Sequence, residues 1–189
     1  YYSDKNNLIA FDTGPANAPI NDWIKSFNVG HMDIGGEIAS RGKVDESKLS
    51  EILNHPYFKM SFPKSLDRFD FPCKIVGGMS LENGAATLTA LVGASVGKGL
   101  DLLPIRPQQL IVSGGGRKNR TMVQEISSRA RIKVEIADKY NWRGDAIEAE
   151  CFAFLSARVL AGLPISYPKT TGVSKPTTGG IIANKMFKS

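Results

Sequence analysis

Apolar residues recur at helical spacing in four stretches of the chain. We predict a helix in each stretch, namely residues 17–27, the segment that follows Asp45, residues 81–100 and residues 145–161. Asp45 is a suitable N-cap for the second helix, and His55-Pro56 should end it. In the third helix Gly93 and Gly97 lie four residues apart, so another backbone can approach it closely.

Shorter apolar runs predict strands at residues 109–113 and 132–137, on either side of a helix around residues 121–130. A triple glycine follows the first of these strands, so the order is strand, glycine loop, helix and strand, which predicts an α/β fold. Residues 1–3 and 8–11 flank a polar turn and predict a hairpin. We expect irregular structure at residues 29–44, 63–72 and 163–189, and we find neither an internal repeat nor a separate second domain.

Composition excludes several classes of protein. The 189 residues are 42% hydrophobic and 22% charged, which is typical of a globular chain and excludes disorder for most of it. The net charge of +6 could assist an anionic ligand but does not require a nucleic-acid partner. The most apolar run, residues 85–97, is too short to span a membrane. Cys73 and Cys151 have no CxxC spacing, so we predict two reduced, buried thiols.

Two turns that contain glycine each follow a predicted strand and precede a predicted helix. Such turns direct backbone N–H groups and a helix N-terminus at one point, which suits a phosphate group. In the first turn Asp12 could hold Mg²⁺ directly or through water, Thr13 could donate a hydrogen bond, and Gly14 would let a phosphate approach the backbone. The alternative is an Asx-turn that only closes the corner of the hairpin, and the short Asp-Thr-Gly sequence by itself leaves both interpretations open.

The second turn is Ser113-Gly114-Gly115-Gly116, followed by Asn119. Its bare backbone would let an adenine or a ribose lie close, with Asn119 either capping the helix or touching the ligand. The turn matches neither a Walker A nor a GxGxxG pattern, and a triple glycine also occurs where a strand simply crosses into a tightly packed helix. The presence of both turns in one chain favours the interpretation that they bind a ligand over the interpretation that they are only structural turns.

Glu148 and a basic run are the remaining candidates. Glu148 falls one turn into the last predicted helix, between apolar faces. Burial there would require a ligand, a cleft, or a partner such as Arg143 or Arg158. The basic residues within 117–120 could attract a polyphosphate, although a solvated helix start is the more frequent meaning of such a run.

The segment Phe11-Asp12-Thr13-Gly14-Pro15-Ala16-Asn17 resembles the FDTGPGN signature of the anhydro-N-acetylmuramic acid kinase family. Further blocks similar to the family follow in its order, at residues 39–45, 55–58, 63–65, 86–89, 113–119, 145–149 and 170–173. The resemblance runs to about Gly180 and covers only the C-terminal half of the family's protein. It implies the C-terminal lobe of the actin-like ATPase and sugar kinase fold, which is ribonuclease H-like, with residues 1–189 as a single nucleotide-binding lobe.

The resemblance also implies an activity. Family members use ATP and Mg²⁺ to phosphorylate the 6-hydroxyl of 1,6-anhydro-N-acetylmuramic acid while a water opens the anhydro ring. The product is N-acetylmuramic acid 6-phosphate, and the reaction belongs to peptidoglycan recycling in the bacterial cytoplasm. A homodimer is implied as well.

By motif, the resemblance assigns three sets of residues. The phosphate-binding turn, with Mg²⁺ at Asp12, would consist of Asp12, Thr13, Gly14 and Asn17. The nucleotide turn would consist of Gly114, Gly115, Gly116 and Asn119. Glu148 would face the cleft near the sugar.

Two family elements lie outside this chain, namely the N-terminal SGTSxDG phosphate loop and the aspartate that acts as general base on the attacking water. Phosphoryl transfer depends on groups from both sides of the γ-phosphate. We therefore expect the isolated chain to be inactive and the N-terminal half of the same enzyme to be its partner.

Two positions depart from the family pattern. Ala16 replaces a glycine, and Leu66-Asp67 replaces the usual Thr-Gly. The methyl group of Ala16 would narrow the phosphate turn, or would oppose a positive φ if the turn needs one. This departure favours an alternative function, a decayed or repurposed nucleotide-binding module without kinase activity. A structural dimerisation lobe is a third interpretation, although core packing explains the glycines and apolar helices equally well.

Overall fold

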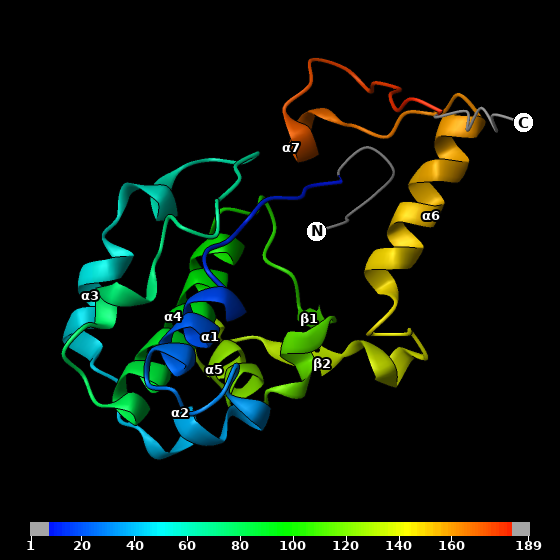
Figure 1. Ribbon diagram of the computed structural model, residues 1–189. Helices are drawn as coiled ribbons and strands as arrows, with labels where there is room; N and C mark the ends of the chain where they lie inside the picture. The colour runs from blue at the N-terminus through cyan, green and yellow to red at the C-terminus, as the bar shows by residue number, and fades with distance from the viewer. Residues whose placement is uncertain (1–7, 183–189) are drawn as a thin grey trace, which may run out of the picture.

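The computed structural model describes residues 8–182, and the fold is organised around one long helix, α4 (Leu81–Asp101) (Figure 1). The helices that pack around α4 are α1 (Asn17–Ser26), α2 (Glu37–Arg41), α3 (Glu46–Leu53) and α5 (Arg120–Ala130). Because α4 is apolar on almost every face, it can only be stable when it is covered on all sides. The predicted helices at residues 17–27 and 81–100 are confirmed.

The main core lies between α4 and α1. Leu88 and Val92 of α4 are buried in one cluster with Trp23 and Ile24 of α1. The Trp23 indole Nε1 donates a hydrogen bond to the carbonyl oxygen of Leu81 at 2.9 Å, so its polar group is satisfied inside the core. Gly93 and Gly97 of α4 face the backbone of α5, as their spacing predicted.

Side-chain caps determine where several helices begin. Asp45 caps α3 by accepting a hydrogen bond from the Lys48 backbone N–H at 2.9 Å, and α3 ends at Leu53, just before His55. Ser80 caps α4 by accepting from the Asn83 backbone N–H. The cap and the end predicted for the helix that follows Asp45, which is α3, are therefore both confirmed.

A small parallel sheet pairs strand β1 (Gln109–Val112) with β2 (Lys133–Ile136), in the register Gln109↔Lys133. Helix α5 connects the two strands, so the predicted succession of strand, glycine loop, helix and strand is confirmed, and the fold is mixed α/β. The first strand is only half-buried and not buried as predicted, because the described residues place β2 beside it on one edge and leave the other edge uncovered.

The irregular segments contain short helices that periodicity did not indicate. Residues 29–44 include α2, whose start is fixed by the Asp33 carboxylate, which accepts hydrogen bonds from the backbone N–H groups of Ile38 and Ala39. These segments also contain η1 (Ile34–Gly36) and α7 (Pro168–Thr171). The short helices outside them are η2 (Pro56–Lys59), η3 (Cys73–Val76), η4 (Gly115–Lys118) and η5 (Ala137–Tyr140).

The hairpin predicted at the start of the chain is not found among the described residues, whereas the irregular tail predicted at its end is found up to residue 182. Residues 1–3, the first strand of the predicted hairpin, lie outside the described residues. Residues 8–11 form a single bridge at Leu8 and no strand. The tail from residue 163 is irregular up to residue 182, apart from α7 and one bridge between Ser166 and Thr177.

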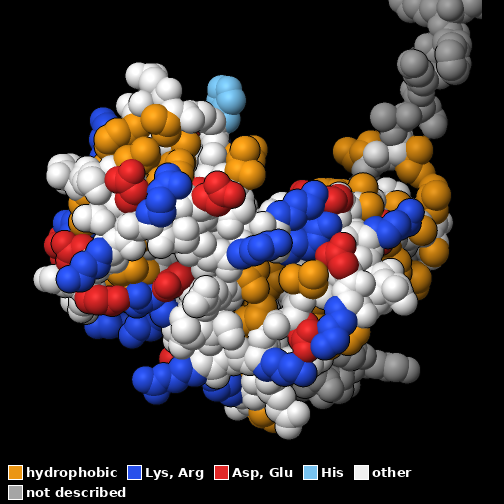
Figure 2. All heavy atoms as spheres, turned by 90° about the horizontal axis from the view of Figure 1, so that it is seen from below, with side chains coloured by type: hydrophobic (Ala, Val, Ile, Leu, Met, Phe, Trp, Pro, Cys, Tyr) orange, Lys and Arg blue, Asp and Glu red, His pale blue; other side chains and the backbone are white. Residues whose placement is uncertain are grey.

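Helix α6 (Ile147–Leu160) extends away from the helices around α4 (Figure 1). None of its side chains is buried, and Phe152 and Phe154 are 65% and 61% exposed. Hydrophobic side chains line the edge of the molecule on the side where α6 lies (Figure 2). Cys151 on α6 is exposed, because nothing among the described residues covers this helix, and Cys73 is half-buried. The prediction of two buried thiols is therefore wrong.

Within residues 8–182 we find no helix long and apolar enough to cross a membrane.

Candidate functional site

The two glycine turns lie at the same cavity, which has a volume of about 1050 Å³. Thr13, Gly14 and Asn17 line it from one side. The triple glycine lines it from the end of β1. A Cβ atom on Gly116 would lie 3.5 Å from Asn17 Nδ2, so the two turns are in contact. Segments that are about 100 residues apart in sequence therefore form one site.

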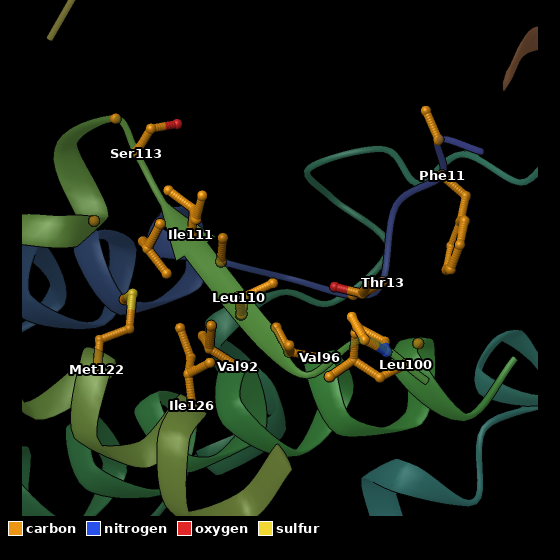
Figure 3. Close-up of a pocket in the computed structure, with 18 of the residues that line it drawn as sticks. Phe11, Thr13, Val92, Val96, Leu100, Leu110, Ile111, Ser113, Met122 and Ile126 are labelled. Atoms are coloured by element: carbon orange, nitrogen blue, oxygen red, sulfur yellow. The ribbon is translucent and has the colours of Figure 1, made fainter. Parts of the chain in front are cut away.

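The floor of the cavity is apolar (Figure 3). Val92, Val96 and Leu100 project from α4, and Met122 and Ile126 project from α5. The two turns approach each other where Asn17 lies near Gly116, while Thr13 lies against Gly99 of α4. Glycine turns of this kind suit a phosphate, and the apolar floor suits an apolar group.

Asp12 is held at the first turn by three hydrogen bonds. Its carboxylate Oδ2 accepts from the Leu66 backbone N–H at 2.8 Å, its own N–H donates to the Lys64 carbonyl at 3.1 Å, and its carbonyl accepts from the Tyr57 hydroxyl at 2.6 Å. The side chain is exposed, and its second carboxylate oxygen has no partner among the described residues.

This arrangement fits Mg²⁺ bound through water. The free carboxylate oxygen of Asp12 is a hard oxygen ligand, and Mg²⁺ usually keeps several waters and is shared with substrate phosphates. Residues 8–182 contain no group of three metal-ligating side chains that could hold the ion without such phosphates. Asp12 itself does not line the cavity, although Thr13 beside it does.

The Tyr57 hydroxyl that supports the turn has a raised pKa of about 12, because burial opposes the phenolate and the charges of Asp12 and Asp70 add to the effect. The stability that this group contributes is present below pH 10 and is lost as the pH rises towards 12. We expect the free energy of unfolding to fall by about 1.4 kcal/mol more in the wild type than in Tyr57→Phe between pH 9 and pH 11. Urea unfolding of both proteins at the two pH values would measure this, and equal losses would contradict it.

The second turn presents open backbone to the cavity. Gly114 has a φ of +70°, which strongly favours glycine, and a Cβ atom on Gly114 or Gly115 would meet nothing within 4 Å. Asn119 is buried, and its side-chain oxygen accepts a hydrogen bond from the Met122 backbone N–H at 2.9 Å. Of the two roles left open for Asn119, the structure shows the cap of α5.

Arg117 holds the triple-glycine turn against the loop that leads to α6. Its side chain is only 7% exposed and forms ion pairs with Asp138 at 2.6 Å and Asp145 at 2.7 Å. Its guanidinium also donates to the Gly114 carbonyl, and the Gly114 N–H donates to Gly144 O. The basic run suggested either attraction of a polyphosphate or a solvated helix start. Arg117 has neither role, because its guanidinium is paired with two aspartates of this chain. The run alone could not indicate these ion pairs, because both aspartates lie further along the chain, after β2.

Hydrogen bonds from Arg117 lower the pKa of both Asp138 and Asp145. A carboxyl group with a lowered pKa stabilises the fold above its unfolded pKa, and that stability is lost as the pH falls through its folded pKa. We expect Arg117→Met to lower the unfolding midpoint at pH 7 and to make the midpoint less sensitive to pH between 6 and 3. Thermal unfolding across this range measures both effects. Parallel curves of unfolding midpoint against pH for the two proteins would show that the ion pairs of Arg117 with Asp138 and Asp145 do not stabilise the fold.

Comparison with known proteins adds to this geometry. The family model for anhydro-N-acetylmuramic acid kinase matches residues 3–185. The relative from Brucella anthropi is 58% identical over 92% of this chain and 47% of its own length. The relatives from Rhizobium rhizogenes and Mesorhizobium japonicum are 56% and 54% identical over 94% and 97% of this chain, which is 48% and 49% of their lengths. All three are named anhydro-N-acetylmuramic acid kinase. This chain belongs to the anhydro-N-acetylmuramic acid kinase family. It spans about half the length of these relatives.

The two departures from the kinase family's pattern both lie at the first turn. Ala16 has a φ of −128°, so this turn does not use the left-handed conformation there. The Leu66 backbone N–H binds the Asp12 carboxylate, a contact that does not depend on the side chain at position 66. Neither departure therefore prevents the turn from forming.

Glu148, which the kinase resemblance placed near the sugar, is exposed, and its side chain forms no ion pair or hydrogen bond with another residue within 8–182. Its two expected partners are engaged elsewhere, because Arg143 pairs with Glu150 and Arg158 donates to the Pro164 carbonyl. Glu148 does not line the main cavity. Glu148 therefore needs no partner to offset burial, because α6 has no covering element among residues 8–182.

Proposed function

We propose that this chain is the C-terminal, nucleotide-binding lobe of an anhydro-N-acetylmuramic acid kinase, with the actin-like fold of sugar kinases. The complete enzyme would transfer a phosphoryl group from ATP to the 6-hydroxyl of 1,6-anhydro-N-acetylmuramic acid while a water opens the anhydro ring. The observation that carries this proposal is the convergence of both glycine turns on one cavity, in a chain of this kinase family.

Within the proposed site each turn has a separate task. Thr13, Gly14 and Asn17 would bind the phosphates of ATP through backbone N–H groups and side-chain donors. Mg²⁺, when bound through water to Asp12, would neutralise phosphate charge. The open backbone of Gly114 and Gly115 would lie against the ribose or the adenine.

The sugar side of the site is proposed to involve both halves of the enzyme. Glu148 would reach the sugar only when the other half covers α6. The general base is proposed to lie in the N-terminal half, so the isolated chain would be inactive. We also propose a homodimer in the bacterial cytoplasm, as the family resemblance implies.

A direct assay tests the function. This chain alone, and a chimera in which it replaces the matching half of the Brucella anthropi kinase, would be incubated with 1,6-anhydro-N-acetylmuramic acid and Mg-ATP. Mass spectrometry would then detect sugar that has gained a phosphoryl group and a water. We expect product from the chimera and none from the chain alone. A folded chimera that makes no product would favour the alternative, a nucleotide-binding module without kinase activity, to which the substitution at Ala16 points.

Gly115→Ala probes contact between the nucleotide and the triple glycine. The new methyl group would meet nothing within 4 Å, so we expect the free energy of unfolding to change by less than about 0.5 kcal/mol. We expect the affinity of the chimera for a fluorescent ATP analogue to fall by about tenfold, because the methyl group would occupy the space of the ligand. Gly179→Ala, far along the chain, is the matched control. Unchanged affinity in Gly115→Ala would place the nucleotide elsewhere.

A further inference from the structure

Lys64 is a buried cation that forms no ion pair within residues 8–182. The residue is only 9% exposed, and its ammonium donates one hydrogen bond, to the Tyr57 carbonyl oxygen at 2.8 Å. The Nζ atom lies 4.4 Å from the centre of the Tyr57 ring and 5.9 Å from the centre of the Phe11 ring. Lysine is rarely buried without a charged partner, because removing its charge from water is costly. A lysine at this position therefore needs an explanation beyond the filling of space.

Lys64 and Tyr57 hold the backbone of Asp12 on both sides. The Asp12 N–H donates to the Lys64 carbonyl at 3.1 Å, and the Tyr57 hydroxyl donates to the Asp12 carbonyl at 2.6 Å. The bond from Lys64 Nζ to the Tyr57 carbonyl closes the triangle. Each of these three residues is therefore hydrogen-bonded to the other two, and we call the three bonds the Asp12 network.

The Asp12 network determines where the Asp12 carboxylate lies. Its Oδ2 atom accepts from the Leu66 backbone N–H, two residues beyond Lys64, so the segment that holds the Asp12 backbone also holds its side chain. Tyr57 is buried in the core cluster that includes residues of α4, which anchors the network to the body of the fold. The side chain of Lys64 is the link between that anchor and the segment at residues 64–66.

The position of Lys64 indicates that it acts through Asp12 and not on a bound ligand. Lys64 does not line the main cavity, whereas Thr13, the residue after Asp12, does (Figure 3). A charged donor makes a stronger hydrogen bond than a neutral one, and a buried bond is not weakened by competing water. This strength explains why a lysine occupies a place that an apolar side chain could fill.

We propose that Lys64 is a positioning residue of the phosphate turn, whose ammonium fixes the Asp12 carboxylate where it can share a hydrated Mg²⁺ with phosphate groups. The role of the metal rests on the proposed function, whereas the positioning of Asp12 does not. Loss of the Lys64 ammonium would free the segment at residues 64–66 to move, and the carboxylate would move with it.

Amide hydrogen exchange in this chain alone tests the positioning without a metal and without catalysis. Methionine keeps an unbranched apolar stem and removes the ammonium, so Lys64→Met should fold and should break one bond of the Asp12 network. We expect exchange at the Asp12 and Leu66 amides to become about tenfold faster. The Ala39 amide, which donates to Asp33, is the internal reference. Unchanged exchange at Asp12 and Leu66, or an equal rise at Ala39, would overturn the proposal.

A second variant tests whether the three bonds act as one network. Tyr57→Phe removes the hydrogen bond to the Asp12 carbonyl and leaves the ring in the core. A closed network fails when any one of its bonds is lost, so the Lys64→Met and Tyr57→Phe effects should not multiply. We expect exchange at Asp12 in the double variant to be within about twofold of that in the faster single variant. Effects that multiply would show that Lys64 does not act through this network.

Mg²⁺ titration of the chimera with the Brucella anthropi half separates positioning from direct contact with phosphate. We expect Lys64→Met to raise the Mg²⁺ concentration for half-maximal rate by about tenfold and to leave the KM for the sugar within about twofold. In an Asp12→Asn background the same substitution should cause no further shift. Shifts that multiply would make Lys64 a direct phosphate ligand and would overturn the proposal.

Ile52→Val is the matched control for lost stability. Ile52 lies on α3 in the same core cluster as Tyr57, and its side chain takes no part in the Asp12 network. Its replacement should lower the unfolding midpoint and leave the Mg²⁺ dependence unchanged. An equal shift of the Mg²⁺ dependence in Ile52→Val and Lys64→Met would reduce the role of Lys64 to general stability and overturn the proposal.

The two proposals can fail separately. Faster exchange at Asp12 in Lys64→Met, together with a chimera that makes no product, would refute the kinase function and support the positioning of Asp12. Product formation by the chimera, with exchange at Asp12 unchanged in Lys64→Met, would support the kinase and refute the role of Lys64.

Discussion

Replacing Asp12 with asparagine is expected to lower the rate of phosphoryl transfer by the chimera by about a hundredfold or more, with little effect on folding. The Asp12 Oδ2 atom accepts a hydrogen bond from the Leu66 backbone N–H, and an amide oxygen in the same place can accept it equally well. The second carboxylate oxygen, which has no partner among the described residues, would become an amide nitrogen. Asparagine therefore preserves the turn and removes the charge proposed to hold hydrated Mg²⁺.

The Asp12→Asn prediction has a matched control on α1. Asp22 is a half-exposed aspartate whose ion pair with Arg68 lies at the surface, so Asp22→Asn should leave the rate within about twofold. Rates would be measured over a range of Mg²⁺ concentrations, because a weakened metal site shifts the Mg²⁺ dependence. A rate for Asp12→Asn equal to that of Asp22→Asn would exclude Asp12 from the phosphate machinery.

Replacing Gly93 with alanine is expected to destabilise the chain by about 2 kcal/mol, although alanine is the better helix former by about 1 kcal/mol. The new Cβ atom would overlap the backbone of α5 at Glu125 and would lie 2.9 Å from the Ile126 nitrogen. Backbone atoms in a packed helix cannot move aside as a flexible side chain can. The two helices would therefore have to separate.

Gly97 provides the control for Gly93 in the same helix. A Cβ atom there would lie 3.2 Å from Ala130 Cα, a tight contact that a small shift relieves. We expect Gly97→Ala to change the free energy of unfolding by less than about 1 kcal/mol, since the gain in helix propensity offsets the crowding. Urea unfolding would rank the two variants. Gly93→Ala at least as stable as the wild type would show that α4 and α5 do not pack this closely.

Local signals predicted the elements around the site correctly. Apolar periodicity indicated α1 and α4, Asp45 indicated the cap of α3, and the triple glycine indicated the turn after β1. These predictions depend on contacts within a few residues of each other, such as the Asp45 hydrogen bond to Lys48. The strand expected at residues 8–11 is absent, because a strand needs a neighbour that pairs with it, and a single bridge at Leu8 is all that the described residues provide.

The sequence by itself determined the family, the principal helices, the βαβ succession, and the positions of the two glycine turns that we propose to bind phosphate and nucleotide. Tertiary structure decided that the two turns share a cavity, that Arg117 forms ion pairs with both Asp138 and Asp145, and that within residues 8–182 β1 pairs with β2 alone. The physical reason is the range of the interactions. Caps and helical periodicity act over three or four residues, whereas the contact between Asn17 and Gly116 joins segments about 100 residues apart and depends on the packing of α1, α4 and α5.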